Sequence, residues 1–405
     1  MVCHENYTIF ETKREYNNVI IIKERIRVPW VSCAALRYKI IENKTFNPLN
    51  VSSKFAICGL PIRVDTYKTC SFGCKYCFSN YRKIMEFEKQ LRVGNIKSVE
   101  RKLDKIFNKG DVKPENFLDV LISKGYDWHC GGMSDPFQPA EKKFQITKQL
   151  IDVTNKYGIH ILFSTKSDTT YDCNIRPDLH TFQLSVTNVD NRTDVEPNVP
   201  SIEERYKFYK SLKERGFKVG IRIQPFIPKI STLDIVEKFK DADHFTIEGL
   251  KLVPQNKEHK EYLLELTGLK SSDFTQMGLL NLKPEIRLEI YKPFIKKLQE
   301  NNISYSIADN DLHQLGTSKC CCGDSLIHKS TDFNNTAMLH KYGIDYTKEQ
   351  IDSEILKCGV DCCKCNQLFT SNRQEGCVTV QDFYDKRFDR KSSPFSPKFL
   401  YTNQK

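Results

Sequence analysis

The sequence has 405 residues, which suits one large domain with appendages or two to three ordinary domains. Hydrophobic residues make up 39% and charged residues 28%, a composition that supports a packed core and argues against global disorder. The formal net charge of +11 favours an anionic partner such as a nucleic acid or a nucleotide, and the alternative is a lysine-rich solvated surface.

The first 60 residues are predicted to be an N-terminal extension, with β-branched runs at 19–22 and 26–30 that favour short strands. From 61 to 310, apolar strand-like runs alternate with helix-like stretches, which is typical of βα units around a parallel sheet. Predicted helices cover 140–157 and 284–301, and a capping-box pattern starts another at Ser201. The predicted strands are 62–66, 126–131, 159–164, 182–187, 217–223, 244–250 and 303–307.

This order predicts an α/β fold, an open partial barrel of the (β/α)6 type, and a doubly wound sheet is the alternative that the pattern leaves open. Residues 311–390 lose the alternation and gain cysteines, so we expect a separate cysteine-rich C-terminal module, followed by a tail at 391–405. No apolar run is long enough to span a bilayer, and the first residues lack the layout of a secretory signal. A cytoplasmic protein without membrane contact is expected.

Sixteen cysteines are many for such a chain, and their clustering points to metal or redox chemistry. Cys70, Cys74 and Cys77 have C-x3-C-x2-C spacing directly after the first strand of the predicted barrel. Three thiolates on one loop can bind three irons of a cubane cluster and leave the fourth iron open to a small molecule. Gly73 permits the tight turn that this wrapping needs. The alternative is a zinc knuckle completed by a distant Cys or His.

With Tyr76 directly before the last cysteine, this loop resembles that of the radical S-adenosylmethionine superfamily, over about residues 60–310. The resemblance implies an oxygen-sensitive 4Fe-4S cluster that binds S-adenosylmethionine and cleaves it reductively to a 5′-deoxyadenosyl radical. It further implies a one-electron reductant such as flavodoxin or ferredoxin, and it makes Tyr76 a contact of the adenine.

A second motif follows the second predicted barrel strand, where Gly131 and Gly132 allow close approach of a ligand to the backbone. The superfamily has a Gly-Gly-Glu-type motif here that binds the cofactor's amino group, but this chain has Met133 where the acid would fall. Ser134 or Asp135 is therefore expected to substitute. The Ser-Asp-Pro-Phe-Gln-Pro run resembles the spore photoproduct lyase branch, and the alternative is a plain helix-entry turn.

Further polar residues stand on or after the next strands. The resemblance implies that Lys166 pairs with the cofactor carboxylate. Ser185, Arg222 and Gln224 are expected to point into the barrel, at the ribose or carboxylate, because unpaired polar groups are costly to bury; the alternative is a surface-facing alternation. For Cys130 the resemblance implies hydrogen-atom donation to a product radical, and the alternative is a buried core cysteine.

Cys358, Cys362 and Cys365 repeat the C-x3-C-x2-C spacing far beyond the barrel. With Cys377 or the Cys320-Cys321-Cys322 run, Cys322 in particular, they are predicted to hold an auxiliary iron–sulfur cluster, with structural zinc as the competitor. The leading hypothesis is a radical enzyme that modifies or repairs a nucleic acid or nucleotide. Radical modification of a peptide or small molecule, and a zinc-stabilised nucleic-acid-binding protein without chemistry, are the alternatives.

Overall fold

The computed structural model describes residues 2–4, 7–16, 19–29, 45–52, 59–82, 90–108, 117–277, 279–309, 311–318 and 320–330. The chain divides into two compact units, Met1–Asn43 and Lys44–Lys405. The N-terminal extension is therefore shorter than the expected 60 residues, because β4 (Leu49–Val51) already pairs antiparallel with β5 (Ile62–Val64) of the second unit.

The described part of the first unit is an antiparallel sheet in the order β1-β2-β3. Its strands are β1 (Val2–His4), β2 (Tyr7–Tyr16) and β3 (Val19–Pro29). The two short strands predicted at 19–22 and 26–30 correspond, up to Pro29, to the single strand β3, which pairs with β2 along its length.

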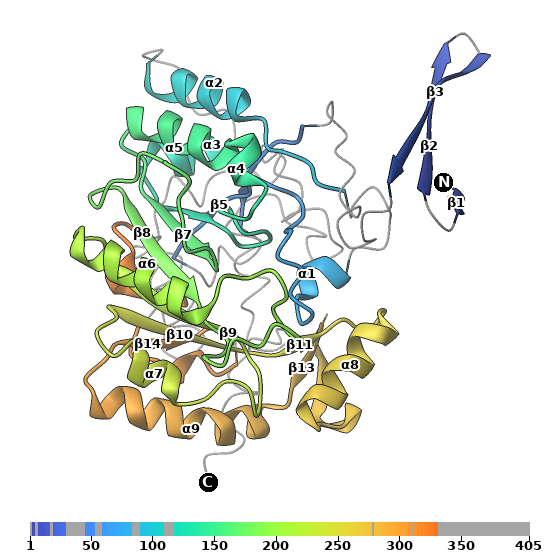
Figure 1. The fold of residues 1–405 in the computed structure, drawn as a ribbon. Coiled ribbons are helices and arrows are strands. Elements are labelled where there is room, and N and C mark those ends of the chain that lie inside the picture. The colour runs from blue at the N-terminus through green and yellow to red at the C-terminus, as the bar shows by residue number, and fades with distance from the viewer. Residues whose placement is uncertain are drawn as a thin grey trace, which may run out of the picture. The chain divides into compact units, whose positions relative to one another are not determined.

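The second unit is built on a sheet of eight described strands in the order β14-β10-β9-β8-β7-β6-β5-β4 (Figure 1). From β5 onward the strands are parallel, and each new strand is added on the same side of the one before. A doubly wound sheet would reverse this order at a switch point. The described order therefore excludes that alternative and confirms the predicted α/β fold with an open, singly wound sheet. The parallel strands are β5, β6 (Trp128–Cys130), β7 (Ile161–Thr165), β8 (His180–Ser185), β9 (Val219–Phe226), β10 (His244–Gly249) and β14 (Tyr305–Ile307).

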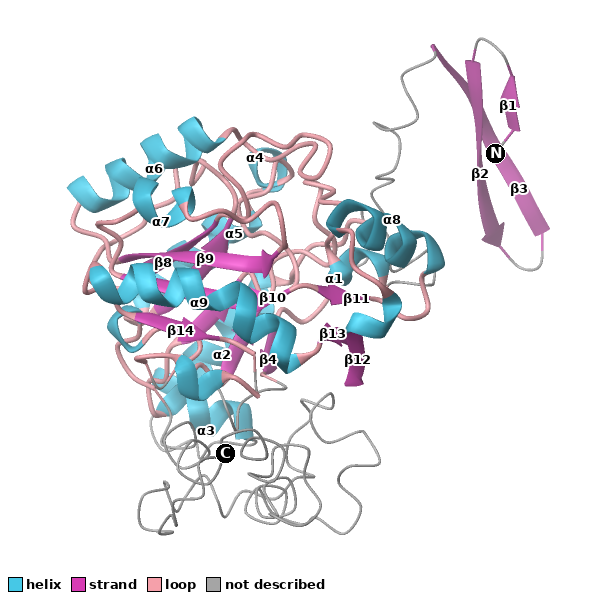
Figure 2. Cartoon of the chain, turned by 90° about the horizontal axis from the view of Figure 1, so that it is seen from below, coloured by secondary structure: helices cyan, strands magenta, loops and turns pink. Residues whose placement is uncertain are grey.

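Helices form a layer over one face of this sheet, called here the outer face (Figures 1 and 2). A singly wound sheet with right-handed crossovers places all its connecting helices on one side. The ring of Phe182 in β8 packs edge-on against Phe208, 6.2 Å away in α6. The described helices are α1 (Phe78–Tyr81), α2 (Ile96–Phe107), α3 (Phe117–Ser123), α4 (Glu141–Phe144), α5 (Ile146–Lys156), α6 (Ile202–Glu214), α7 (Asp234–Lys238), α8 (Lys257–Thr267) and α9 (Pro284–Glu300).

Local chemistry accounts for several of these boundaries. The capping box predicted at Ser201 is present at the start of α6, with Glu204 as its other half. The helix predicted over 140–157 is instead two helices, broken at Gln145, where φ is 50°. The buried carboxylate of Glu141 accepts hydrogen bonds from the backbone N–H groups of Thr147 (3.0 Å) and Lys148 (2.8 Å). These bonds satisfy the first turn of α5 and stabilise the break.

A small sheet lies beyond β10 in the order β11-β13-β12, with α8 inserted between its first two strands in the chain. Its strands are β11 (Lys251–Leu252), β12 (Phe274–Met277) and β13 (Leu279–Leu282). None of these was predicted from the sequence. Leu252 and Leu282 belong to the same buried cluster as Phe72 and Cys74, so this sheet supports the loop that carries the cysteines.

Residues 311–318 and 320–330, called here the crossing segment, run across the inner face of the large sheet. Their contacts begin beside β14 and end at Asp127, immediately before β6. The described residues 311–318 and 320–330 of the cysteine-rich module expected from residue 311 are bonded to the large sheet. Residues 331–390 lie outside the described part, so the boundaries of that module stay a prediction. Strand side chains donate hydrogen bonds to backbone carbonyls along the segment. Ser306 donates to Cys321 (3.0 Å), Gln183 donates to Cys322 (2.9 Å), and Thr181 donates to Leu326 (2.9 Å).

Candidate active site

The loop that carries Cys70, Cys74 and Cys77 follows β5 and leads into α1. The side-chain amide of Gln138 clamps the start of this loop through both of its polar atoms. Its Nε2 donates to the carbonyl of Thr69 (2.9 Å), and its Oε1 accepts from the backbone N–H of Ser71 (2.7 Å). Because Gln138 is fully buried, these bonds hold the loop against the β6–α4 connection.

The three thiols lie close enough to influence one another electrostatically, and Cys74 is coupled to both of the others. Burial raises the pKa of the Cys70 thiol to about 12, and the nearby Asp135 charge adds to it, while backbone N–H groups of Asp135 and Phe72 oppose the shift. Burial, with the charge of Glu196, also raises the pKa of Cys74 well above its usual value. Burial thus favours the neutral thiol, and a bound cation reverses this preference because metal ligation deprotonates thiols. The loop therefore fits a metal cluster.

Tyr76, in the cysteine loop, joins a buried group of charged side chains beside it. Its hydroxyl donates to the Glu196 carboxylate, which also pairs with Lys166 Nζ (3.2 Å) and an Arg205 guanidinium nitrogen (3.3 Å). Lys166 Nζ is buried, lies 5.5 Å from the centroid of the Tyr76 ring, and makes no hydrogen bond of good geometry within the described residues. Its ammonium group therefore has donors to spare for an anionic ligand.

The β6–α4 connection carries Gly131 and Gly132, expected to let the cofactor approach the backbone, and Ser134 and Asp135, expected to bind its amino group. Gly131 has φ +105°, and a Cβ there would lie 2.1 Å from the carbonyl oxygen of Ser164 in β7, so no other residue fits. Gly132 faces the inner side, where a Cβ would meet the side chains of Arg63 and His129.

Ser134 and Asp135 already hold parts of the protein together. Ser134 Oγ donates to the carbonyl of Tyr67 (2.6 Å). The Asp135 carboxylate accepts from Thr165 Oγ1 (2.7 Å) and from the backbone N–H groups of Lys166 (2.6 Å) and Phe137 (3.0 Å). An ionised carboxylate has about four acceptor positions, so Asp135 keeps one for an ammonium donor. Burial raises the Asp135 pKa, and these hydrogen bonds oppose the shift.

Arg222 and Gln224 lie on the inner face of β9, and both contact the buried carboxylate of Glu248 in β10. An Arg222 nitrogen lies 3.5 Å from Glu248, and Gln224 donates to the same oxygen. Arg222 also donates to Gln183 (3.1 Å), which accepts from Ser164 Oγ (3.2 Å). The inner face at this level is thus a connected polar surface, unlike a packed apolar barrel core. Ser185, half-buried, is in register with Arg222.

Sequence reasoning missed Glu248, Glu196, Gln183 and His129. An acid inside the buried run His244–Gly249 is a signal that could have found Glu248, since an unpaired buried carboxylate is costly. Glu196 lies in an irregular loop between β8 and α6 and offers no such signal. His129 Nε2 bonds Ser164 Oγ (2.9 Å), and burial, with the charge of Arg222, lowers the His129 pKa to about 3, so this imidazole is neutral.

Cys130 lies on the outer face of the sheet. It is in register with Phe163 of β7, which is in register with Phe182 of β8, and all three are fully buried. Since successive side chains of a strand point to opposite faces, His129 and not Cys130 faces the inner side. This placement favours the core-cysteine alternative over hydrogen-atom donation.

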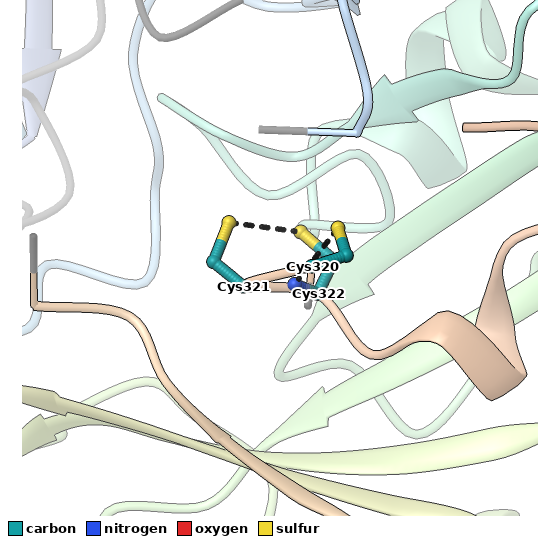
Figure 3. Close-up of side chains that lie close together, drawn as sticks. All are labelled: Cys320, Cys321 and Cys322. Carbon is teal, nitrogen blue, oxygen red and sulfur yellow. Dashed lines mark hydrogen bonds between the residues drawn. The ribbon is translucent and has the colours of Figure 1, made fainter. Parts of the chain in front are cut away.

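Cys320, Cys321 and Cys322 form a second thiol group, within the crossing segment (Figure 3). Their three sulfur atoms lie within 4.8 Å of one another. Cys322, expected as an auxiliary-cluster ligand, thus lies with its two chain neighbours. The other expected ligands, Cys358, Cys362, Cys365 and Cys377, lie outside the described residues.

No family model matches the chain. It is 25% identical over 244 residues to an uncharacterized protein of Methanocaldococcus jannaschii, MJ0683, which covers 56% of this chain and 83% of that protein. Among solved structures it is similar to spore photoproduct lyase complexed with dinucleoside spore photoproduct, with a TM-score of 0.46 and 14% identity over 61% of this chain and 76% of that one.

It is also similar to Streptococcus suis SuiB bound to S-adenosylmethionine, with a TM-score of 0.39 and 14% identity over 63% of this chain and 52% of that one. Similarity at this level does not decide an activity, so the function must be argued from the residues of this chain. Within the described ranges, no helix has both the length and the apolar character needed to cross a membrane.

Proposed function

We propose that this chain is a radical S-adenosylmethionine enzyme with a 4Fe-4S cluster on Cys70, Cys74 and Cys77. The observation that carries the proposal is the cysteine loop itself, which leaves the carboxyl end of β5 and is clamped by Gln138. Ligand crevices of parallel βα folds lie at this end of the strands. When bound, the reduced cluster would supply the electron that cleaves S-adenosylmethionine to a 5′-deoxyadenosyl radical.

Three residues are suited to orient the methionine end of that cofactor. The buried Lys166 ammonium has spare donors, which fit a carboxylate. The remaining acceptor position of Asp135 fits an ammonium group, and Ser134 keeps acceptor lone pairs on its hydroxyl. The chain thus offers opposite charges for the two charged groups of an amino acid.

The adenosine end would meet the backbone near Tyr76 and the polar inner face. Tyr76 is 4% exposed and its hydroxyl is engaged by Glu196, so an adenine contact falls to its main chain. Arg222 and Gln224, held by Glu248, are suited to donate to ribose or carboxylate oxygens. Ser185, Gly131 and Gly132 complete the proposed cofactor surface.

The proposed substrate is a nucleic acid or nucleotide. Its support is the excess of 62 Lys and Arg over 51 Asp and Glu, which favours a polyanion. If Lys and Arg bind phosphates at about 6–10 places, affinity falls by about 10³ to 10⁵ between 50 and 200 mM salt. If nucleic-acid binding is absent or independent of salt, the excess positive charge belongs to a lysine-rich solvated surface and not to a nucleic-acid site.

The test of the proposal is anaerobic reconstitution followed by reduction with dithionite or with flavodoxin, with S-adenosylmethionine present. The proposal expects 5′-deoxyadenosine, and more of it when a nucleic-acid substrate is present. A colourless protein that binds zinc and nucleic acid but forms no 5′-deoxyadenosine would support a zinc-stabilised binding protein instead.

A further inference from the structure

The thiols of Cys320, Cys321 and Cys322 are gathered more tightly than a cubane cluster requires. The sulfur atoms of Cys321 and Cys322 are 3.8 Å apart, and all three sulfurs lie within 4.8 Å of one another. Two thiolates on one tetrahedral ion with metal–sulfur bonds of about 2.3 Å lie about 3.8 Å apart. In a cubane each cysteine binds a different iron, which places the ligand sulfurs further apart.

The backbone that carries these thiols is fixed on both sides by hydrogen bonds. The carbonyl of Cys321 accepts from Thr246 Oγ1 (3.3 Å) and Ser306 Oγ (3.0 Å), which come from β10 and β14. The carbonyl of Cys322 accepts from Gln183 in β8 (2.9 Å). These bonds hold the thiols in place across three strands.

The turn that follows is held just as firmly. The N–H of Cys320 donates to Asp324 Oδ1 (3.1 Å), and the N–H of Gly323 donates to the carbonyl of Cys320 (3.0 Å). Gly323 has φ +91°, and a Cβ there would lie 2.4 Å from the His244 ring. Only glycine fits this turn against β10.

The sulfur of Cys320 accepts the backbone N–H of Cys322 at 3.4 Å. Hydrogen bonds of this kind orient ligands and tune a metal site from outside its ligand shell. Cys320 and Cys322 are buried, at 0% and 2% exposure, and Cys321 is half-buried. Burying three neighbouring thiols in their ionised form costs free energy unless a cation offsets their charge.

We propose that Cys320, Cys321 and Cys322 together bind one zinc ion, as a site separate from the cluster on Cys70, Cys74 and Cys77. Zinc suits three thiolates at these distances, with a water or another donor in its fourth tetrahedral position, and it needs no redox partner. Binding releases protons from the thiols and leaves the oxidation state of sulfur unchanged. The ion anchors the crossing segment to the inner face of β8, β10 and β14. Cys322 is then a zinc ligand and not a ligand of an auxiliary cluster.

The test measures iron and zinc per chain in full-length variants purified anaerobically and exposed to both metals. The Cys320/Cys321/Cys322→Ala variant should lose about one zinc per chain and keep its iron. The Cys70/Cys74/Cys77→Ala variant should lose iron and keep that zinc. The matched control is Cys173→Ala, which removes a buried free thiol elsewhere and should change neither metal. Unchanged zinc, or a loss of iron in its place, in the Cys320/Cys321/Cys322→Ala variant overturns the proposal.

A milder variant guards against misfolding as the cause. Cys321→Ser replaces the half-buried thiol by a hydroxyl of similar size. It should weaken zinc affinity by at least about tenfold, measured by competition with a chromophoric chelator. Even the loss of a residue that only hydrogen-bonds to a zinc ligand lowers metal affinity by that factor. Cobalt in place of zinc should show thiolate-to-metal charge-transfer absorption that falls by about one third in Cys321→Ser. Unchanged affinity and absorption in a folded Cys321→Ser protein would contradict a three-thiolate site.

Discussion

The two described cysteine groups of this chain differ in what holds them. Cys70, Cys74 and Cys77 are spread along a loop beyond the sheet, which Gln138 clamps at the loop's start. Cys320, Cys321 and Cys322 are consecutive, lie on the inner face of the sheet, and are fixed through their backbone to strand side chains. Spread thiols on a loop suit a cluster with several irons, and gathered thiols suit one ion.

The surroundings of the two groups differ in the same sense. Beside the first lie the polar and charged side chains of Lys166, Tyr76 and Asp135, which the proposed function assigns to a small-molecule cofactor. Around the second lie hydroxyl and amide side chains of Thr246, Ser306 and Gln183, whose hydrogen bonds go to backbone carbonyls. In the two proposals above, the first group serves the chemistry and the second holds a segment in place.

The largest expected effect concerns the loop. Cys74→Ala removes the most buried thiol of the three, at 7% exposure, and leaves one iron without its ligand. We expect iron binding at this site and cofactor cleavage to be lost. Iron analysis and the visible absorption of the anaerobic protein check this. Retention of full iron content would show that the loop is not the cluster site.

Lys166→Met tests the proposed carboxylate contact. Loss of a charge-assisted hydrogen bond of about 1.5–3 kcal/mol weakens S-adenosylmethionine binding by about 10- to 150-fold. Lys148→Met, which removes a half-exposed lysine paired with Asp152 in α5, is the matched control and should leave affinity unchanged. Equal affinities of the two variants, measured by equilibrium binding to cluster-loaded protein, would remove Lys166 from the cofactor site.

Glu248→Ala tests whether the polar inner face is held by its buried acid. Glu248 is 2% exposed and pairs with Arg222 and Lys251, so its removal takes the carboxylate away from the buried Arg222 guanidinium and should cost about 3 kcal/mol of stability. Glu289→Ala, at a residue 70% exposed in α9, should change stability by about 0.5 kcal/mol or less. Chemical denaturation of both variants checks the difference, and equal stabilities would contradict it.

Gly131→Ala tests the contact between the β6–α4 connection and β7. A methyl group 2.1 Å from the Ser164 carbonyl oxygen, at a positive φ, should cost about 2–3 kcal/mol. At Gly125 φ is +71° and a Cβ would meet nothing within 4 Å, so Gly125→Ala should cost only about 1 kcal/mol. Denaturation midpoints compare the two, and a smaller loss at Gly131 than at Gly125 would argue against the close approach.

The smallest effect concerns pH. Burial lowers the pKa of His129 and of His244 to about 3, whereas an unfolded histidine titrates near 6.5. The unfolded chain therefore binds more protons between these values, and the free energy of unfolding should rise with pH from about 3 to 6.5 and then level off. His244→Asn should make the unfolding midpoint less dependent on pH between 5 and 7. An equal slope in both proteins would contradict the neutral, buried His244.

The sequence predicted the strands of the large sheet well, because buried parallel strands are continuous apolar runs such as 159–164 and 217–223. It did not predict the helix break at Gln145, which depends on hydrogen bonds from the backbone of the next helix to the carboxylate of Glu141. Local patterns also placed the crossing segment in a separate module. Its attachment to the sheet includes single hydrogen bonds from scattered strand side chains, such as Thr181 and Gln183, which leave no periodic signal.

The candidate site was predictable where residue type and spacing carry the chemistry, as for Cys70, Cys74 and Cys77. The hydrogen bonds by which site residues also serve the fold were not predictable. Ser134 and Asp135 bond the neighbouring loops, and Glu196 pairs with Lys166 from an irregular segment. The face on which Cys130 lies depends on strand register, which was fixed only by the pairing with Phe163.

The most direct test of the central claim is the formation of 5′-deoxyadenosine from S-adenosylmethionine by the anaerobically reconstituted, reduced chain. The account predicts product from the parent chain and from the Cys320/Cys321/Cys322→Ala variant where it folds, and none from Cys77→Ala. Product from Cys77→Ala at the parental rate, or none from the iron-loaded parent chain, would contradict the claim that the loop of Cys70, Cys74 and Cys77 is the catalytic centre.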